Sequence, residues 1–332
     1  MRHPSKYSRY CAEFDFALTY PPVSPEKYAY FEDALPGHPF DAKPSLRNAW
    51  WLSECALASY CEAEDAAVAY AQAALDIAGG GPVRGPSRGG QCYVLFDSAK
   101  TILAFRGTQV VLPDDLRSVA ALKSCIGEVS RDLRTDAAIP LVPWMGRSKG
   151  RVHSGFHASL EEMWPEICSR LEPLRDGRSL WLCGHSLGGA LATLAADRID
   201  DVSGVYSFGS PAVGGADFAA RWEVGGIRFR NFTDIVPWLP SRVLNYRHVR
   251  GGMYFNRHGR MLDEPSNLQM LADALFGAPF TAIRSFRGIR NGSLNALAPR
   301  CLLDHAPLEY VRRVWRGYET ALSQVELNSR AN

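Results

Sequence analysis

The chain has 332 residues, of which 46% are hydrophobic and 22% charged, close to the averages of globular proteins. Lys and Arg total 37 against 35 Asp and Glu, and the net charge of +2 argues against a nucleic-acid-binding protein that works by bulk electrostatics. No apolar run approaches the ~18–20 residues that span a bilayer. These features predict a soluble globular protein without a transmembrane segment.

The first part of the chain lacks both regular periodicity and a secretory signal. Residues 1–47 are rich in proline and aromatic residues, which predicts an irregular arm ahead of a single domain over 48–332. Glu13, Asp15 and a proline pair stand where a signal peptide would have its apolar stretch. We therefore expect a cytoplasmic protein by default, with signal-independent export left open.

The eight cysteines include no Cys-x-x-Cys pair, and no two histidines stand at zinc-ligand spacing. This predicts reduced thiols, with Cys183 packed in the core, and neither a metal nor a cofactor. The sequence does not indicate an oligomeric state.

Helical and strand-like patterns alternate from residue 48 onward. The region 48–78 predicts two helices that end at a glycine run, followed by two short β-rich segments and a helix over 159–174 that contains Pro165. Further along, the expected elements are a buried strand over 179–183, a helix over 188–196, and strands over 204–208 and 227–232. This alternation predicts an α/β fold with a mostly parallel central sheet flanked by helices.

Three serines stand in a Gly-x-Ser-x-Gly pattern, which marks a nucleophile only on a sharp strand-to-helix turn. Ser87 lies in a Gly/Pro-rich loop, and no helix pattern follows Ser148. Only Ser186 has a buried strand before it and a tight apolar helix after it. The helix N-terminus also favours developing negative charge.

Five segments, in this order, resemble the fungal-type (class 3) lipases, which are α/β-hydrolases. The segment around Ser186, Gly-His-Ser-Leu-Gly-Gly, is similar to the nucleophile segment of that family. The others are Phe105-Arg106-Gly107-Thr108, Val152-His153-Ser154-Gly155-Phe156, Asn231-Phe232-Thr233-Asp234-Ile235-Val236-Pro237, and Asp304-His305 with Tyr310. The likeness covers roughly 90–310 and implies a serine ester hydrolase with a Ser-Asp-His triad.

The order Ser, acid, His along an α/β-hydrolase chain restricts the remaining triad candidates. For the base, His305 lies in a loop before the last helix, whereas His248 is in a strand-like alternation and His258 in a basic turn. For the acid, Asp234 directly follows a strand. Asp217 and Asp263 have the pattern of solvated turn residues. Asp304 is the neighbour of His305 in the sequence, so the side chains of these two residues should diverge.

These choices predict that Ser186 attacks an acyl carbonyl, His305 transfers its proton, and Asp234 orients the imidazolium. The backbone amides of Leu187 and Thr108 are expected to form the oxyanion hole. The resemblance adds the Thr108 hydroxyl to that site.

Two further segments carry apolar residues at helical spacing. Residues 109–131 occupy the place of the family's lid, although an ordinary surface helix has the same pattern. Within 251–300, Leu268, Met270, Leu271, Leu275, Phe276 and Phe280 could line an acyl pocket or belong to the core.

We therefore expect a lipid ester hydrolase, most simply a triacylglycerol lipase that acts at a lipid–water interface. Phospholipase A1 or general esterase activity remains open, because the same triad serves both. A non-catalytic binding protein of the same fold is the remote alternative, and it usually lacks triad members.

Overall fold

The computed structural model describes residues 28, 30–31, 40–87, 89–108, 140–240, 242–277 and 300–331. The predicted lid over 109–131 lies outside these residues, as does most of the predicted arm over 1–47, so both remain predictions. No helix within the described ranges is both long and apolar enough to cross a membrane.

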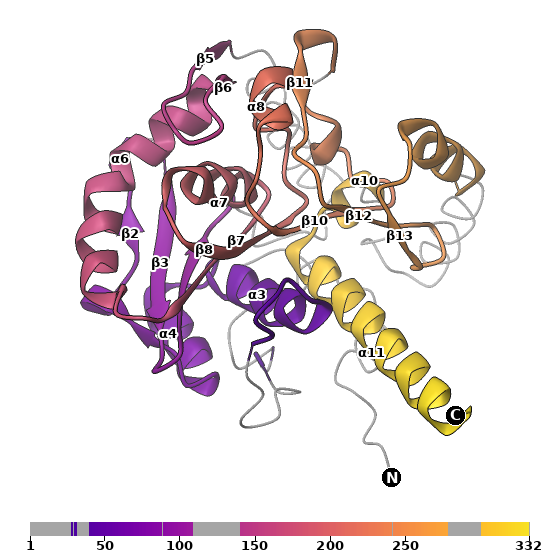
Figure 1. The fold of residues 1–332 in the computed structure, drawn as a ribbon, viewed down its shortest axis with the longest axis horizontal. Coiled ribbons are helices and arrows are strands. Elements are labelled where there is room, and N and C mark those ends of the chain that lie inside the picture. Colours follow the sequence, from indigo (N-terminus) through magenta and orange to yellow (C-terminus); the bar gives the residue numbers. More distant parts are fainter. Residues whose placement is uncertain are drawn as a thin grey trace, which may run out of the picture.

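A twisted central sheet forms the middle layer of the molecule (Figure 1). Its strands lie in the order β1-β3-β4-β7-β8-β10-β12-β13, and β2 pairs with β3. Neighbours from β4 to β12 are parallel, while the pairs at both ends are antiparallel. The strands are β1 (Asp76–Ile77), β2 (Val83–Arg84), β3 (Gln91–Phe96), β4 (Lys100–Phe105), β7 (Ser179–His185), β8 (Val202–Phe208), β10 (Gly226–Asn231), β12 (Gly252–Phe255) and β13 (Met261–Asp263).

Helices cover both faces of this sheet, which is why its central strands read as continuous apolar runs. One face packs against α3 (Leu46–Ala58) and α11 (Pro307–Ala331), with α4 (Ala63–Gln72) beside them. The other face packs against α6 (Ser154–Leu171) and α7 (Leu187–Arg198). Cys183 is fully buried in the first of these layers, as predicted.

The remaining elements connect or flank these layers. A small second sheet has the strand order β11-β9-β6-β5. Its strands are β5 (Leu141–Pro143), β6 (Arg151–His153), β9 (Gly214–Gly215) and β11 (Tyr246–Arg247). The short helices are η1 (Ala78–Gly80), η2 (Glu172–Leu174), α8 (Ala216–Ala220), η3 (Val236–Trp238), η4 (Arg242–Leu244) and α10 (Arg300–Leu303).

The strand order and the strand–turn–helix at Ser186 are those of an α/β-hydrolase, so the predicted fold class is confirmed. The predicted helices and strands occur, with small shifts at their ends. The second predicted helix over 48–78 does not reach the glycine run, because α4 ends at Gln72 and the short strand β1 follows at Asp76–Ile77. Helix α6 begins at Ser154 rather than Ser159, because the His153 side chain accepts the Phe156 amide and caps the helix. Pro165 lies inside α6 without ending it.

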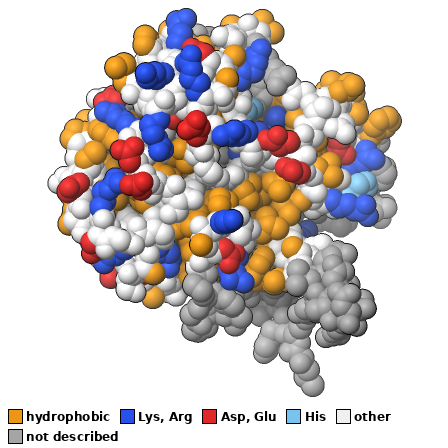
Figure 2. All heavy atoms as spheres, in the orientation of Figure 1, with side chains coloured by type: hydrophobic (Ala, Val, Ile, Leu, Met, Phe, Trp, Pro, Cys, Tyr) orange, Lys and Arg blue, Asp and Glu red, His pale blue; other side chains and the backbone are white. Residues whose placement is uncertain are grey.

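The apolar residues singled out within 251–300 differ in burial where the segment is described. A helix over 267–277 buries Met270 but leaves Leu268, Leu271, Leu275 and Phe276 exposed. Phe280 lies outside the described residues. Several apolar side chains accordingly lie on the surface of the lobe in Figure 2 where Figure 1 draws this helix.

Close packing between α7 and the sheet requires glycine at position 188. An ideal Cβ added to Gly188 would lie 2.2 Å from the carbonyl oxygen of Phe105 in β4. This carbonyl belongs to the backbone of β4, one of the central strands, so it has little freedom to move.

We predict that Gly188→Ala lowers the free energy of unfolding by about 2 kcal/mol or more, because the methyl group overpacks this contact. Gly81→Ala is the matched control, since a Cβ there meets no atom within 4 Å. Its effect should stay within about 0.5 kcal/mol in urea denaturation. Equal stability of the two variants would contradict this account of the contact.

Candidate active site

Ser186 occupies the turn between β7 and α7 in a backbone conformation that side chains rarely adopt. Its φ is 56° and its ψ −127°, and its amide donates to the carbonyl of Phe208 at 2.9 Å. A non-glycine residue in such a region costs of order 1–3 kcal/mol and persists only where the surroundings hold it. Here β7, β8 and α7 fix the backbone, so that the hydroxyl faces the loop after α10.

Ser186, His305 and Asp234 form a continuous hydrogen-bonded chain. His305 Nε2 lies 2.9 Å from Ser186 Oγ, and His305 Nδ1 lies 2.9 Å from Asp234 Oδ2. A carboxylate only accepts hydrogen bonds, so Nδ1 of a neutral His305 carries the proton and Nε2 accepts from the serine hydroxyl. The structure therefore brings together the three residues that the sequence selects from distant parts of the chain.

Asp234 is almost completely buried and is held as an acceptor by two further donors. Its Oδ2 accepts the Tyr310 hydroxyl at 2.5 Å, and its Oδ1 accepts the Val236 amide at 2.9 Å. Burial, followed by the charge of Asp234, raises the pKa of Tyr310 well above its usual value. Tyr310 therefore stays protonated and keeps donating to the carboxylate.

A second histidine, His185, supports the backbone of His305. Its Nε2 lies 2.6 Å from the His305 carbonyl oxygen, and its Nδ1 lies 2.7 Å from the hydroxyl of Tyr60. Since a carbonyl only accepts, Nε2 carries the proton and Tyr60 donates to Nδ1. Burial, with a smaller contribution from His305, holds the pKa of His185 well below its usual value, so the ring is neutral and this tautomer is kept.

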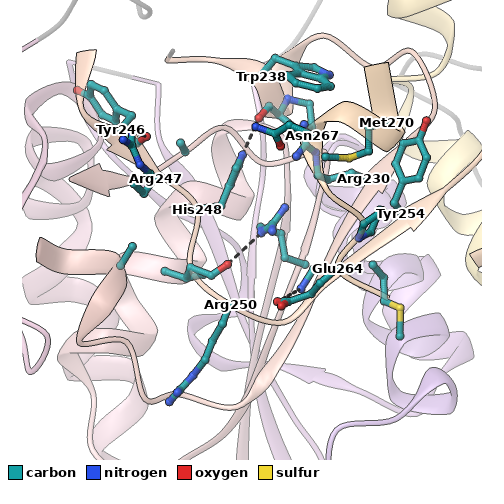
Figure 3. Close-up of a pocket in the computed structure, with 18 of the residues that line it drawn as sticks. Arg230, Trp238, Tyr246, Arg247, His248, Arg250, Tyr254, Glu264, Asn267 and Met270 are labelled. Carbon is teal, nitrogen blue, oxygen red and sulfur yellow. Dashed lines mark hydrogen bonds between the residues drawn. The ribbon is translucent and has the colours of Figure 1, made fainter. Parts of the chain in front are cut away.

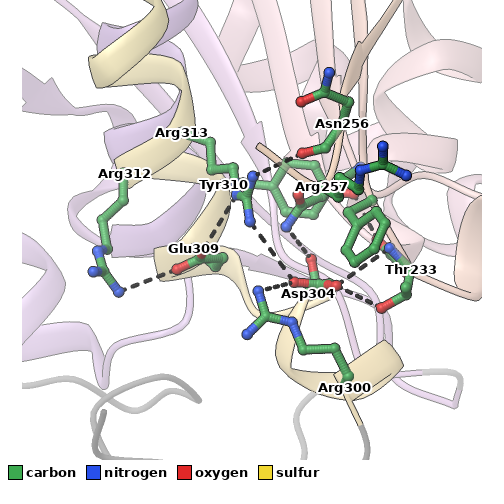
Figure 4. A network of polar contacts seen from close by, with 12 residues as sticks. Thr233, Asn256, Arg257, Arg300, Asp304, Glu309, Tyr310, Arg312 and Arg313 are labelled. Carbon is green, nitrogen blue, oxygen red and sulfur yellow. Dashed lines mark hydrogen bonds and ion pairs between the residues drawn. The ribbon is translucent and has the colours of Figure 1, made fainter. Parts of the chain in front are cut away.

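Asp304 anchors the loop that presents His305 (Figure 4). Its buried carboxylate accepts the amide of Thr233 at 3.2 Å and the Thr233 hydroxyl at 2.5 Å, and it lies 2.7 Å from Arg300 Nη2. The side chain thus points away from His305, as the sequence predicts for adjacent residues. Through Thr233 it ties the loop of the histidine to the segment that carries Asp234.

The two residues predicted to bind an oxyanion belong to the two segments that meet at the serine. Leu187 is the first residue of α7, so its amide has no acceptor within the helix. Thr108 follows Gly107, whose added Cβ would lie 3.1 Å from Ser186 Cβ. The end of β4 and the start of α7 therefore meet at Ser186.

The rejected candidates lie in other surroundings. His258 is exposed and accepts from Arg257 Nε at 3.0 Å, while His248 donates to the carbonyl of Pro237. Ser87 is exposed. Ser148 is buried and donates to Asp197, which makes it part of a structural contact.

Sequence reasoning missed Tyr60 and the anchoring role of Asp304. Tyr60 lies 125 residues before its partner His185, in the turn between α3 and α4, and no local pattern indicates the pairing. An acidic residue next to a candidate base was a signal for Asp304, but only the fold shows which arginine and threonine it contacts.

Residues 102–244 match the family model "Lipase (class 3)". Ser186 and Asp234 fall inside this span and His305 outside it. Among curated relatives, Secreted mono- and diacylglycerol lipase 1 of Fusarium solani is 36% identical over 30% of this chain and 32% of its own. Phospholipase A1-II 5 of Oryza sativa subsp. indica is 30% identical over 31% and 29%. The matched region thus spans about a third of these relatives.

Among solved structures, lipase II from Rhizopus niveus is similar over 63% of this chain and 80% of that chain, with 22% identity and a TM-score of 0.48.

The expected cytoplasmic location is contradicted by these relatives, several of which are named as secreted lipases. The expectation was wrong because it rested only on the absence of a signal-like pattern near the first residue, which does not determine where a protein acts.

Four of the five sequence segments, and the turn at Ser186, fall within the matched residues 102–244. Over residues 102–244 the chain is therefore similar to the class 3 lipases.

Proposed function

We propose that this protein hydrolyses carboxylic esters of lipids through an acyl-enzyme on Ser186. The observation that carries the proposal is the hydrogen-bonded chain from Ser186 Oγ through the His305 ring to Asp234. Its geometry allows proton transfer from the hydroxyl without any movement of the three side chains.

In the proposed reaction, Ser186 Oγ attacks the ester carbonyl while its proton passes to His305 Nε2. The imidazolium is stabilised by Asp234, whose carboxylate also accepts hydrogen bonds from the Tyr310 hydroxyl and the Val236 amide. His305 then protonates the leaving alkoxide, and the same nitrogen activates the water that releases the fatty acid.

In this proposal the amides of Leu187 and Thr108 donate hydrogen bonds to the negative oxygen of the tetrahedral intermediate. The Thr108 hydroxyl is a further donor. Both residues flank Ser186, and the N-terminus of α7 favours the charge. Loss of one such donor typically costs about 3 kcal/mol of transition-state stabilisation.

For the substrate, we infer an acylglycerol, because the Fusarium relative is named as a mono- and diacylglycerol lipase. Triacylglycerol is the extension that the sequence resemblance suggests. Phospholipase A1 activity is the second candidate, because the Oryza relative carries that name. The names of the secreted relatives further support action outside the cytoplasm.

We predict that Ser186→Ala abolishes ester hydrolysis without unfolding the protein. The measurement compares release of fatty acid from mono-, di- and triacylglycerol and from phosphatidylcholine by the wild type and the variant. Ser87→Ala, in the exposed Gly/Pro loop, is the control and should keep wild-type rates. Wild-type turnover by a folded Ser186→Ala protein would refute the assignment, and the preferred substrate distinguishes the two candidate activities.

We also predict that Asp304→Asn lowers kcat about 100-fold with little change in KM, because His305 shifts relative to Ser186. Removal of a buried partner of Arg300 should lower the free energy of unfolding by about 3 kcal/mol. Asp201→Asn, in an exposed ion pair, is the matched control and should change neither quantity measurably. Wild-type kcat and stability in Asp304→Asn would exclude the anchoring role.

A further inference from the structure

A pocket separate from the site at Ser186 lies on the α8 side of β10 and β12 (Figure 3). It has a volume of about 420 Å³, and among the described residues that line it are four arginines and a single acidic residue, Glu264. The residues of the Ser186 chain are not among them. A pocket of this size accommodates a small ligand, and its lining favours an anionic one.

Arg228 and Arg230 form the floor of this pocket. They stand two residues apart on β10, so both side chains lie on the sheet face opposite to Phe229, which belongs to the core. Arg230 is only 8% exposed, and its guanidinium lies 4.7 Å from the centre of the Trp238 ring. In Figure 3 Trp238 and Arg230 lie together at one end of the pocket, whereas Arg250 points away from it.

The positive charge of Arg228 is poorly compensated within the described part of the chain. Its Nε donates to the carbonyl of Val249 at 3.4 Å, and its Nη1 is buried with no hydrogen-bond partner among the described residues. Burial, followed by repulsion from Arg230, lowers the pKa of Arg228 to about 9. A bound anion would relieve both unfavourable effects.

Glu264 supplies only part of that compensation, because its charge raises the pKa of Arg228 less than burial and Arg230 lower it. It is exposed, and its Oε1 accepts the amides of Gly251 at 2.6 Å and Gly252 at 3.1 Å. These two backbone bonds hold the pKa of Glu264 below its usual range, so the carboxylate is charged but directed at backbone. Among the described residues that line the pocket, Glu264 is thus the one acidic residue beside four arginines.

The helix over 267–277 adds an apolar rim to this basic pocket. Asn267 and Met270 of that helix line the pocket, while Leu268, Leu271 and Leu275 are 76%, 49% and 66% exposed. These three leucines recur at helical spacing and form one apolar face. A polar group held at the arginines would therefore have apolar surface beside it.

We propose that this pocket binds a phosphate group, carried by the headgroup of an anionic lipid or by a free phosphate ester. Guanidinium groups present paired N–H donors that match phosphate oxygens, and two adjacent ones offer more donors than a single carboxylate uses. The exposed leucines favour the lipid source. The site also adjoins the proposed catalytic centre, since Trp238 ends the short helix η3, whose first amide, that of Val236, donates to Asp234.

Binding is to be measured on the full chain carrying Ser186→Ala, so that lipids stay intact and the result does not depend on the proposed hydrolysis. One arm titrates glycerol 3-phosphate by calorimetry. The other measures co-sedimentation with phosphatidylcholine vesicles, with and without phosphatidic acid. We expect Arg230→Gln to weaken binding about ten-fold or more. Arg175→Gln, which removes an exposed charge outside the pocket, is the matched control and should bind unchanged.

Binding in the calorimetric arm assigns the pocket to the phosphate group itself, and binding only to vesicles with phosphatidic acid assigns it to a lipid headgroup. Arg247→Gln, at the half-buried rim, is the second variant if Arg230→Gln does not fold, and we expect it to weaken binding by a smaller factor. The proposal is overturned if neither probe binds. It is also overturned if the folded pocket variants bind as tightly as Arg175→Gln.

Discussion

The contact between the start of α7 and the two central strands β4 and β7 is the constraint on which the site depends. Gly188 lies against the Phe105 carbonyl with no room for a side chain, so the helix begins directly above the sheet. The chain must then reverse within one residue, and that residue is Ser186, at a positive φ. Its hydroxyl is raised above the sheet edge as a result, and the end of β4 with Thr108 comes beside it.

The same edge collects the side chains of the hydrogen-bonded chain that ends at the serine. Gly209, at φ +61°, follows β8, and an ideal Cβ there would lie 2.9 Å from Asp234 Oδ2 and 3.0 Å from His305 Nδ1. A side chain at this position would separate the acid from the base. Around this contact, Tyr310 donates a hydrogen bond to Asp234. His185 donates to the backbone carbonyl of His305, and Asp304 accepts from Thr233. Because each is buried and paired, they hold the hydrogen-bonded chain of Ser186, His305 and Asp234 in place.

The sequence was sufficient for the features that depend on local patterns. The buried run before Ser186 and the small residues after it predict the turn, and the strand before Asp234 predicts where the acid lies. Contacts between distant segments could not be predicted in this way. No periodicity in the sequence indicates that Tyr60 contacts His185. In the sequence, Arg228 and Arg230 look like ordinary strand residues, and only the fold shows that both line one pocket. The exposed leucines of 267–277 carry the same helical pattern as a buried face, and only the neighbouring elements decide between the two.

Covalent labelling with an alkyl fluorophosphonate tests the central claim most directly, because it reports which hydroxyl is activated rather than which variant loses activity. The reagent loses fluoride to the attacking oxygen and leaves a stable phosphonate ester on it. We predict a single label on Ser186 in the tryptic peptide 179–198, which fragmentation distinguishes from Ser179, and no label when His305 is replaced by alanine. A label on any other serine of the folded protein, or equal labelling without His305, would contradict the account.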